Sequence, residues 1–145
     1  MKELVNTQFC EDILALLKAF KNMPELVAKA FIFIERITFV GAHEARLKSE
    51  NRFYIDFSKT RLLKEIEETF TVPRDWITTE IRDSAVHSYA FLMKRRMVPD
   101  ETLGAMSPFL VQNLSINVEN AAQRRLVQRT FFALYCLLEN RSMYF

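Results

Sequence analysis

Glycine is scarce in this sequence and proline is only slightly more common, with two and four copies among 145 residues. The tight turns of a β-sandwich or barrel depend on glycine-containing pairs, so an all-β fold is disfavoured. A glycine-rich phosphate loop is excluded, because Gly41 and Gly104 stand far apart. These shortages favour an all-α chain.

Cysteine is scarce as well. Cys10 and Cys136 are too few for a disulfide framework, and each lies in an apolar helical pattern. We therefore expect buried free thiols in a reducing compartment, and hence an intracellular protein, cytoplasmic or nuclear. The N-terminal stretch carries acidic residues inside its apolar segment, unlike a secretory signal peptide.

The stretch 121–140 lacks an uncharged run long enough to cross a membrane. The chain as a whole also lacks a large excess of positive or negative charge. The uncharged part of this stretch, 130–138, has nine residues. That is half of the roughly eighteen that a transmembrane helix needs, so no membrane insertion is expected. Twenty basic and eighteen acidic residues leave a net charge of +2, which does not by itself indicate a polyanion partner.

Hydrophobic residues, in contrast, make up half of the chain, and thirteen residues are phenylalanine. Such a composition supports a densely packed core and excludes disorder. A chain of this length is an ordinary single domain. We expect one helical domain over 1–145, with an irregular insertion at about 41–58.

Apolar residues recur at helical spacing along most of the chain. Amphipathic patterns cover 6–21 and 59–70. Two further patterns, 24–40 and about 74–97, are apolar around much of the helix and predict inner helices that neighbours cover on more than one side. Three segments share an apolar stretch with an aromatic residue at the same position: KAFIFIERI (29–37), HSYAFLMKR (87–95) and RTFFALYCL (129–137). Because the first two belong to the predicted inner helices, we expect 131–138 to be buried as well.

Helix boundaries are predicted from glycine, serine and proline. Gly41 is expected to end the second helix, and Ser58 to cap the next one. Between them, the alternation of Phe53, Ile55 and Phe57 indicates an extended segment. Proline favours the first position of a helix, so four helix starts are predicted, at Pro24, Pro73, Pro99 and Pro108. The helices that begin at Pro99 and Pro108 are expected to be short.

The predicted fold is therefore all-α, built of stacked αα-hairpins as either a short α-solenoid or a six- to seven-helix bundle. The segments ILALLKAFKNMPELVAKAFIFIERI and SPFLVQNLSINVENAAQRRLVQRTFFALYCLLEN resemble helical repeats of the HEAT and armadillo type. The Asp and Arg that follow the turn in such repeats have counterparts only in Asn120 and in Arg124 or Arg125. The resemblance implies a scaffold that binds other macromolecules on an extended surface.

No catalytic pattern emerges from the remaining polar residues. His43 is expected at the surface of the insertion, and His87 as a hydrogen-bonded histidine of the core. Neither has cysteine or acidic partners at metal-ligand spacing. The apolar neighbours of Cys136 raise the pKa of a thiol and disfavour a nucleophile. We expect neither an enzyme, nor a cofactor, nor a metal site.

Two groups of residues are candidates for binding a partner. Arginines four positions apart on one helix face can grip carboxylates or phosphates, and aromatic residues beside an arginine can form a binding hot spot. In the insertion, a flap folded over the core is the alternative to exposed aromatics. The first group is Arg124, Arg125, Gln128 and Arg129, and the second is Arg52, Phe53 and Tyr54.

The function expected from these observations is a non-enzymatic protein–protein interaction or adaptor module, whose partner is another protein or a second copy of the chain. One alternative is a compact bundle of the Bcl-2 type that takes an amphipathic helix in a groove. Its Asn-Trp-Gly-Arg signature is absent, since Trp76 stands in RDWIT. The other alternative is nucleic-acid binding through the arginine face, which the low net charge disfavours.

Overall fold

The computed structural model describes residues 4–45 and 49–141, without the side chains of the last two. Within these ranges the chain forms seven α-helices and no strand, which confirms the all-α prediction. Their bounds are α1 (Thr7–Ala19), α2 (Pro24–Glu44), α3 (Tyr54–Lys59), α4 (Leu62–Thr71), α5 (Thr79–Leu92), α6 (Asp100–Leu114) and α7 (Ala121–Arg141).

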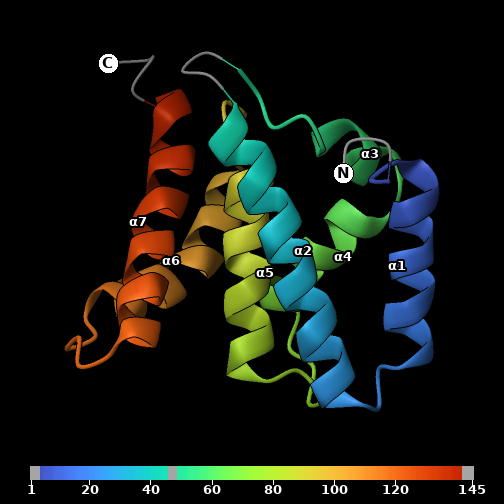
Figure 1. Cartoon of the computed structure of the whole chain (residues 1–145), viewed down its shortest axis with the longest axis horizontal. Coiled ribbons are helices and arrows are strands. Elements are labelled where there is room, and N and C mark those ends of the chain that lie inside the picture. Colours follow the sequence, from blue (N-terminus) through green and yellow to red (C-terminus); the bar gives the residue numbers. More distant parts are fainter. Residues whose placement is uncertain (1–3, 46–48, 142–145) are drawn as a thin grey trace.

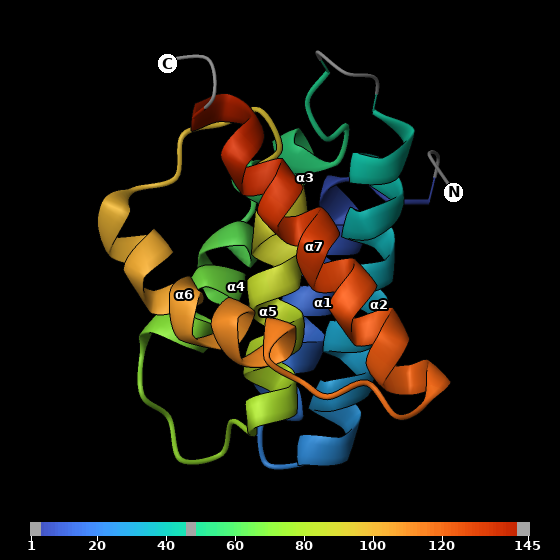
Figure 2. The same ribbon diagram turned by 90° about the vertical axis from the view of Figure 1, so that its left-hand side faces the viewer.

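Helix α5 lies at the centre of the bundle (Figures 1 and 2). It packs against α2, α4, α6 and α7, while α1 lies at the outer edge against α2, α3 and α4. Nine residues of α5 are buried, which agrees with the inner helix expected there. A helix surrounded by the others in this way is the organisation of a closed bundle, the second of the two forms that the sequence allowed.

Capping side chains explain where two of the helices begin. The Asn6 side chain accepts a hydrogen bond from the Phe9 N–H at the start of α1, and Thr78 accepts one from Ile81 at the start of α5. Pro24 opens α2 as predicted. The helix start predicted at Pro73 is wrong, because 73–78 form a loop and Thr78 supplies the cap instead.

The extended segment predicted at 53–57 is also wrong. Phe53 and Phe57 are both buried and lie four residues apart, Phe53 at the N-cap of the short helix α3 and Phe57 within it. This spacing puts both rings on one helical face. Ile55, which suggested a period of two, is 55% exposed. Ser58 lies within α3 rather than at a cap, and α4 begins only at Leu62.

One continuous helix, α6, replaces the two short helices predicted after residue 98. Pro108 lies inside it. Proline cannot donate the main-chain hydrogen bond at this position and normally bends or ends a helix. The buried Met106 and Leu110 lie on either side of the proline, so packing against the core holds both halves of the helix in place.

Helix α7 is amphipathic rather than buried along 131–138. Ala133, Cys136 and Leu137 face the core, whereas Phe131 is 60% exposed. The prediction of burial failed because α5 and α6 cover only one side of this helix. None of the described helices combines the length and the apolar content that a membrane crossing requires.

Gly41 does not end α2, which continues to Glu44. A Cβ atom at this position would overlap the Asn51 side chain and lie 2.7 Å from the Phe53 ring. Asn51 is buried, and its amide donates to the carbonyls of Thr38 and Phe91, each at 2.9 Å. The glycine thus permits the chain after α2 to close over the helix, and Asn51 holds it there.

We predict that Gly41→Ala lowers the free energy of unfolding by roughly 1–3 kcal/mol, because the methyl group displaces Asn51 and leaves buried carbonyls without a donor. Gly104→Ala is the matched control, since open space surrounds Gly104 within α6. It should raise stability by up to about 1 kcal/mol through helix propensity. Urea unfolding of both variants measures the difference, and equal effects would contradict the packing role of Gly41.

Both cysteines are buried and free, as predicted. Burial raises the pKa of Cys10 and the pKa of Cys136, each to about 12. We therefore predict that iodoacetamide leaves both thiols of the folded protein unmodified while it alkylates a short cysteine peptide to completion. In concentrated urea both should react, and mass spectrometry counts the modified thiols. Rapid alkylation of either thiol without urea would contradict their burial.

Candidate functional site

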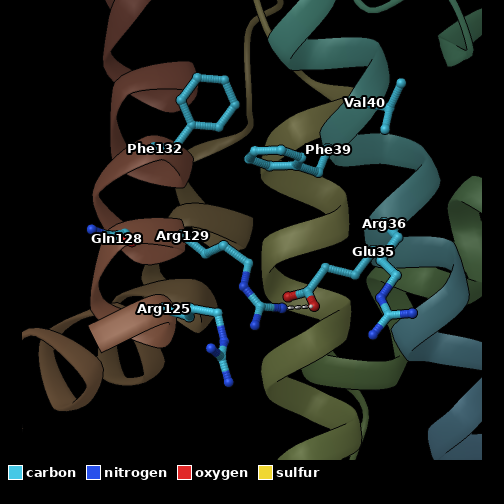
Figure 3. A pocket seen from close by; sticks show the side chains of 8 residues that line it. All are labelled: Glu35, Arg36, Phe39, Val40, Arg125, Gln128, Arg129 and Phe132. Atoms are coloured by element: carbon cyan, nitrogen blue, oxygen red, sulfur yellow. Dashed lines mark hydrogen bonds and ion pairs between the residues drawn. The ribbon is translucent and has the colours of Figure 1, made fainter. Parts of the chain in front are cut away.

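A groove of about 640 Å³ separates α2 from α7 on one side of the bundle. Both helices pack on α5 and run in the same direction, from the bottom to the top of Figure 1. Figure 3 shows the side chains that form its walls. They are Glu35, Arg36, Phe39 and Val40 of α2, and Arg125, Gln128, Arg129 and Phe132 of α7.

One end of the groove is aromatic. The rings of Phe39 and Phe132 meet edge to face with centroids 5.4 Å apart. Both rings rest on Phe91 of the central helix, at 5.6 Å each. Val40 completes this end, and the exposed His43 stacks on Phe39. Because three helices each supply one ring of the cluster, this end of the groove is firmly fixed.

The other end of the groove is cationic. Arg129 lies in the middle of the α7 wall and places Nη1 2.8 Å from Oε2 of Glu35. Arg36 and Arg125 extend from opposite walls towards the same end of the gap (Figure 3). Both are exposed, and neither forms an ion pair with a described residue. Two positive charges without an ion-pair partner among the described residues therefore face one end of the groove, opposite its aromatic end.

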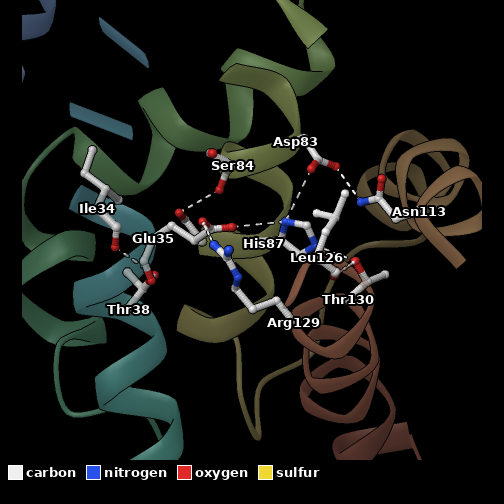
Figure 4. Close-up of polar contacts among 11 residues, drawn as sticks. Ile34, Glu35, Thr38, Asp83, Ser84, His87, Asn113, Leu126, Arg129 and Thr130 are labelled. Atoms are coloured by element: carbon white, nitrogen blue, oxygen red, sulfur yellow. Dashed lines mark hydrogen bonds and ion pairs between the residues drawn. The ribbon is translucent and has the colours of Figure 1, made fainter. Parts of the chain in front are cut away.

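A chain of buried polar groups lies beneath the groove (Figure 4). Glu35 is 4% exposed, and its second oxygen, Oε1, lies 3.2 Å from Nδ1 of His87. Asp83, one turn before His87 on α5, places Oδ2 3.9 Å from the same nitrogen. Asn113 of α6 donates to Asp83 at 2.7 Å. Together with Arg129, these contacts connect α2, α5, α6 and α7.

The hydrogen bond on the far side of His87 fixes the role of Nε2. The Thr130 hydroxyl donates to the carbonyl of Leu126 at 2.8 Å, so it accepts from Nε2 of His87 at 2.9 Å. Nδ1 is left facing the two carboxylates without an aligned hydrogen bond. The prediction that His87 is a hydrogen-bonded core residue is confirmed, since the ring is fully buried.

The structure brings three of the predicted partner-binding residues together in the groove: Arg125, Gln128 and Arg129. Arg124 lies on the same turn of α7 but is not part of the lining. Whether these residues bind a partner stays a prediction.

The second predicted group lies away from the groove. Arg52 pairs with Glu44 at 3.0 Å and covers the ring of Phe53, which is 2% exposed. Tyr54 is half-buried beneath the guanidinium of Arg96, which lies 3.5 Å from the ring centroid. This segment therefore forms the folded flap that the sequence left as the alternative to exposed aromatics.

Sequence reasoning missed the α2 wall of the groove, including Arg36, Phe39 and Val40. The charged pair Glu35–Arg36 within the otherwise apolar run KAFIFIERITF was the available signal. A buried carboxylate needs a partner, and here the partner stands 94 positions later in the chain. No local pattern connects the two segments.

Asp83 provides a pH-dependent test of the buried network. Burial raises the pKa of Asp83, while His87, Asn113 and Arg129 act against this increase and Glu35 adds to it. The folded state thus favours the protonated acid. The stability gained from this preference is present below the ordinary pKa of about 4. It is lost as the pH rises through the higher folded-state pKa.

We predict that Asp83→Asn, which cannot ionise, becomes progressively more stable relative to the natural protein as the pH rises from about 4 towards about 7. The amide oxygen can still accept from Asn113. Urea unfolding across this range measures the difference in free energy, and Asp75→Asn is the control, since Asp75 is exposed in the 73–78 loop. A difference that falls with pH would contradict the raised pKa.

Within 4–45 and 49–139, no three His, Cys, Asp or Glu side chains are arranged so that they could hold a metal ion. Comparison with protein-family models, with curated proteins and with solved structures found no match to this chain. Its function must therefore be inferred from the chemistry of the groove and of the charged network beneath it.

Proposed function

We propose that this protein is a non-enzymatic interaction module that binds an amphipathic helix of a partner protein in the groove between α2 and α7. The observation that carries the proposal is the groove itself, with its aromatic end on Phe39 and Phe132 and its mostly apolar walls. Amphipathic helices bind by placing one apolar face in such a groove. The volume of about 640 Å³ offers room for the anchoring side chains of one helix face.

The firmly packed walls support this proposal. A binding site that is already formed costs little ordering on association, so more of the contact energy appears as affinity. Phe39 and Phe132 rest on the buried Phe91, while Arg129 is tied to Glu35. Neither wall needs to rearrange before a partner can contact it.

The chemical groups near the groove favour binding over catalysis. The exposed His43 stacks on Phe39, but no hydrogen bond or ion pair with a described residue orients it as a general base. His87, beneath the groove, is fully buried, and its ring nitrogens face Thr130 and two carboxylates. A base must reach the proton that it removes, and this one has no open side. Cys136 is buried, and its pKa of about 12 leaves it protonated at neutral pH.

A second copy of the chain and a nucleic acid remain the other partners to test. Phe131, Tyr135 and Leu138 form an exposed stripe on α7 beside the groove, so a second copy could extend the contact. The arginines of the groove could attract phosphates, but the net charge of +2 disfavours a polyanion partner. The groove as a whole therefore supports a protein helix best.

The proposal can be tested with helices selected from a display library of amphipathic helical peptides. We predict that Val40→Asp lowers the affinity of the protein for the selected peptides by about tenfold or more, because the new carboxylate must lose its water against their apolar face. Val111→Asp is the matched control, since Val111 is 62% exposed on α6 and away from the groove. Isothermal titration calorimetry measures the affinities.

Thermal melts of both variants identify any loss of folding. As an independent measurement, hydrogen exchange should show that a bound peptide protects 35–40 and 125–132. Peptides that bind the Val40→Asp variant as tightly as the natural protein, and that protect other segments, would place the binding site elsewhere.

A further inference from the structure

We infer that the helix bound in the groove carries an acidic side chain next to its large apolar anchors, with the acid held by Arg36 and Arg125 and the anchors placed against Phe39 and Phe132. This inference rests on the proposed function and adds the chemistry of the partner to it. It also specifies which end of the groove receives which part of the helix.

The balance of charge in the groove supports an acidic partner. Glu35 is the only acid among the described residues of the lining, and its charge is already paired, because Oε2 lies 2.8 Å from Nη1 of Arg129. Its other oxygen, Oε1, points to the buried ring of His87. Glu35 is also nearly fully buried. Neither Arg36 nor Arg125 forms an ion pair with this buried carboxylate. A partner carboxylate at this end of the groove would supply the charge that the protein lacks.

The order of residues along both walls gives the groove a direction. On α2, Arg36 precedes Phe39 by three positions, and on α7, Arg125 precedes Phe132 by seven. These separations correspond to about one and two helical turns, or roughly 5–10 Å along the axis. Because the two helices run the same way, both walls are cationic at one end and aromatic at the other. A matching helix needs its acid about three to seven residues from its apolar anchor.

Exposure limits what each single charge can contribute. Arg125 is exposed to solvent, so its pairing with a carboxylate is screened. Its main effect should be to select among partners and to disfavour basic helices. The apolar end supplies affinity, while the arginine end determines which helix sequence binds and in which direction.

A polyanion is the other ligand that arginines could attract. A nucleic acid could pair its phosphates with the arginines and stack a base on an aromatic ring, but the net charge of +2 gives the chain little attraction for a polyanion. An acidic amphipathic helix uses both ends. The observations therefore favour the helix, and competition by an oligonucleotide can distinguish the two ligands.

The test is a display selection from one helical library against the natural protein and against the double variant Arg36→Glu/Arg125→Glu. Helices selected on the natural protein should be enriched in Asp or Glu about three to seven residues from a large apolar residue. The double variant should reverse this preference and enrich Lys or Arg at the same positions.

A matched pair of single variants then tests the contact directly. Arg125→Glu should lower the affinity for the acidic peptides by about three- to tenfold, and this loss of affinity should be smaller at high salt. Arg124→Glu makes the same charge change on the same turn of α7 but outside the lining, and should alter affinity by less than about twofold. Thermal melts establish that all variants fold.

The outcomes separate this inference from the proposed function. Peptides that depend on Val40 but show no acidic preference, or that respond equally to Arg124→Glu and Arg125→Glu, would overturn the acidic partner and leave the helix-binding groove intact. Peptides whose affinity is unchanged by Val40→Asp would overturn both the acidic partner and the helix-binding groove. Displacement of the peptides by a single-stranded oligonucleotide at physiological salt would overturn the inference in favour of a polyanion.

Discussion

The contact of Glu35 with Arg129 and His87 determines how the two walls of the groove are spaced. It connects α2 to α7 and to the central helix through one carboxylate. Removing a charge from water is costly, so a buried carboxylate is stable only while its partners stay in place. Separating α2 from α7 would leave Glu35 without Arg129. The charge pair therefore favours one spacing of the walls rather than a range of spacings.

Aromatic packing performs the same task at the other end of the groove. Phe39 and Phe132 meet over Phe91, so each wall is fixed at two points, one polar and one apolar. The C-terminal part of α7 has a further attachment, because the buried Lys94 pairs with Glu139. A site fixed in this way presents its free arginines to solvent without closing over them. Stability of the bundle and availability of the groove thus depend on the same contacts.

Local sequence patterns predicted most helices but not all of their limits. Gly41 was expected to end a helix, yet its role is to leave room for Asn51 and Phe53. Pro108 was expected to start one, yet burial of Met106 and Leu110 keeps a single helix through it. The apparent alternation at 53–57 arose from one exposed isoleucine. In each case the packing of side chains in the core outweighed the local preference.

The sequence alone predicted the all-α class, the inner position of α5 and the buried state of His87 and both thiols. It also selected Arg125, Gln128 and Arg129, which line the α7 wall of the groove. These properties follow from composition and from helical periodicity, which are local. Only the tertiary structure decided that 35–40 stands opposite 125–132, that Phe53 belongs to the core, and that Phe131 faces solvent. Which faces of two helices meet depends on how all the described helices pack together. Helical periodicity carries no information about segments some ninety residues apart.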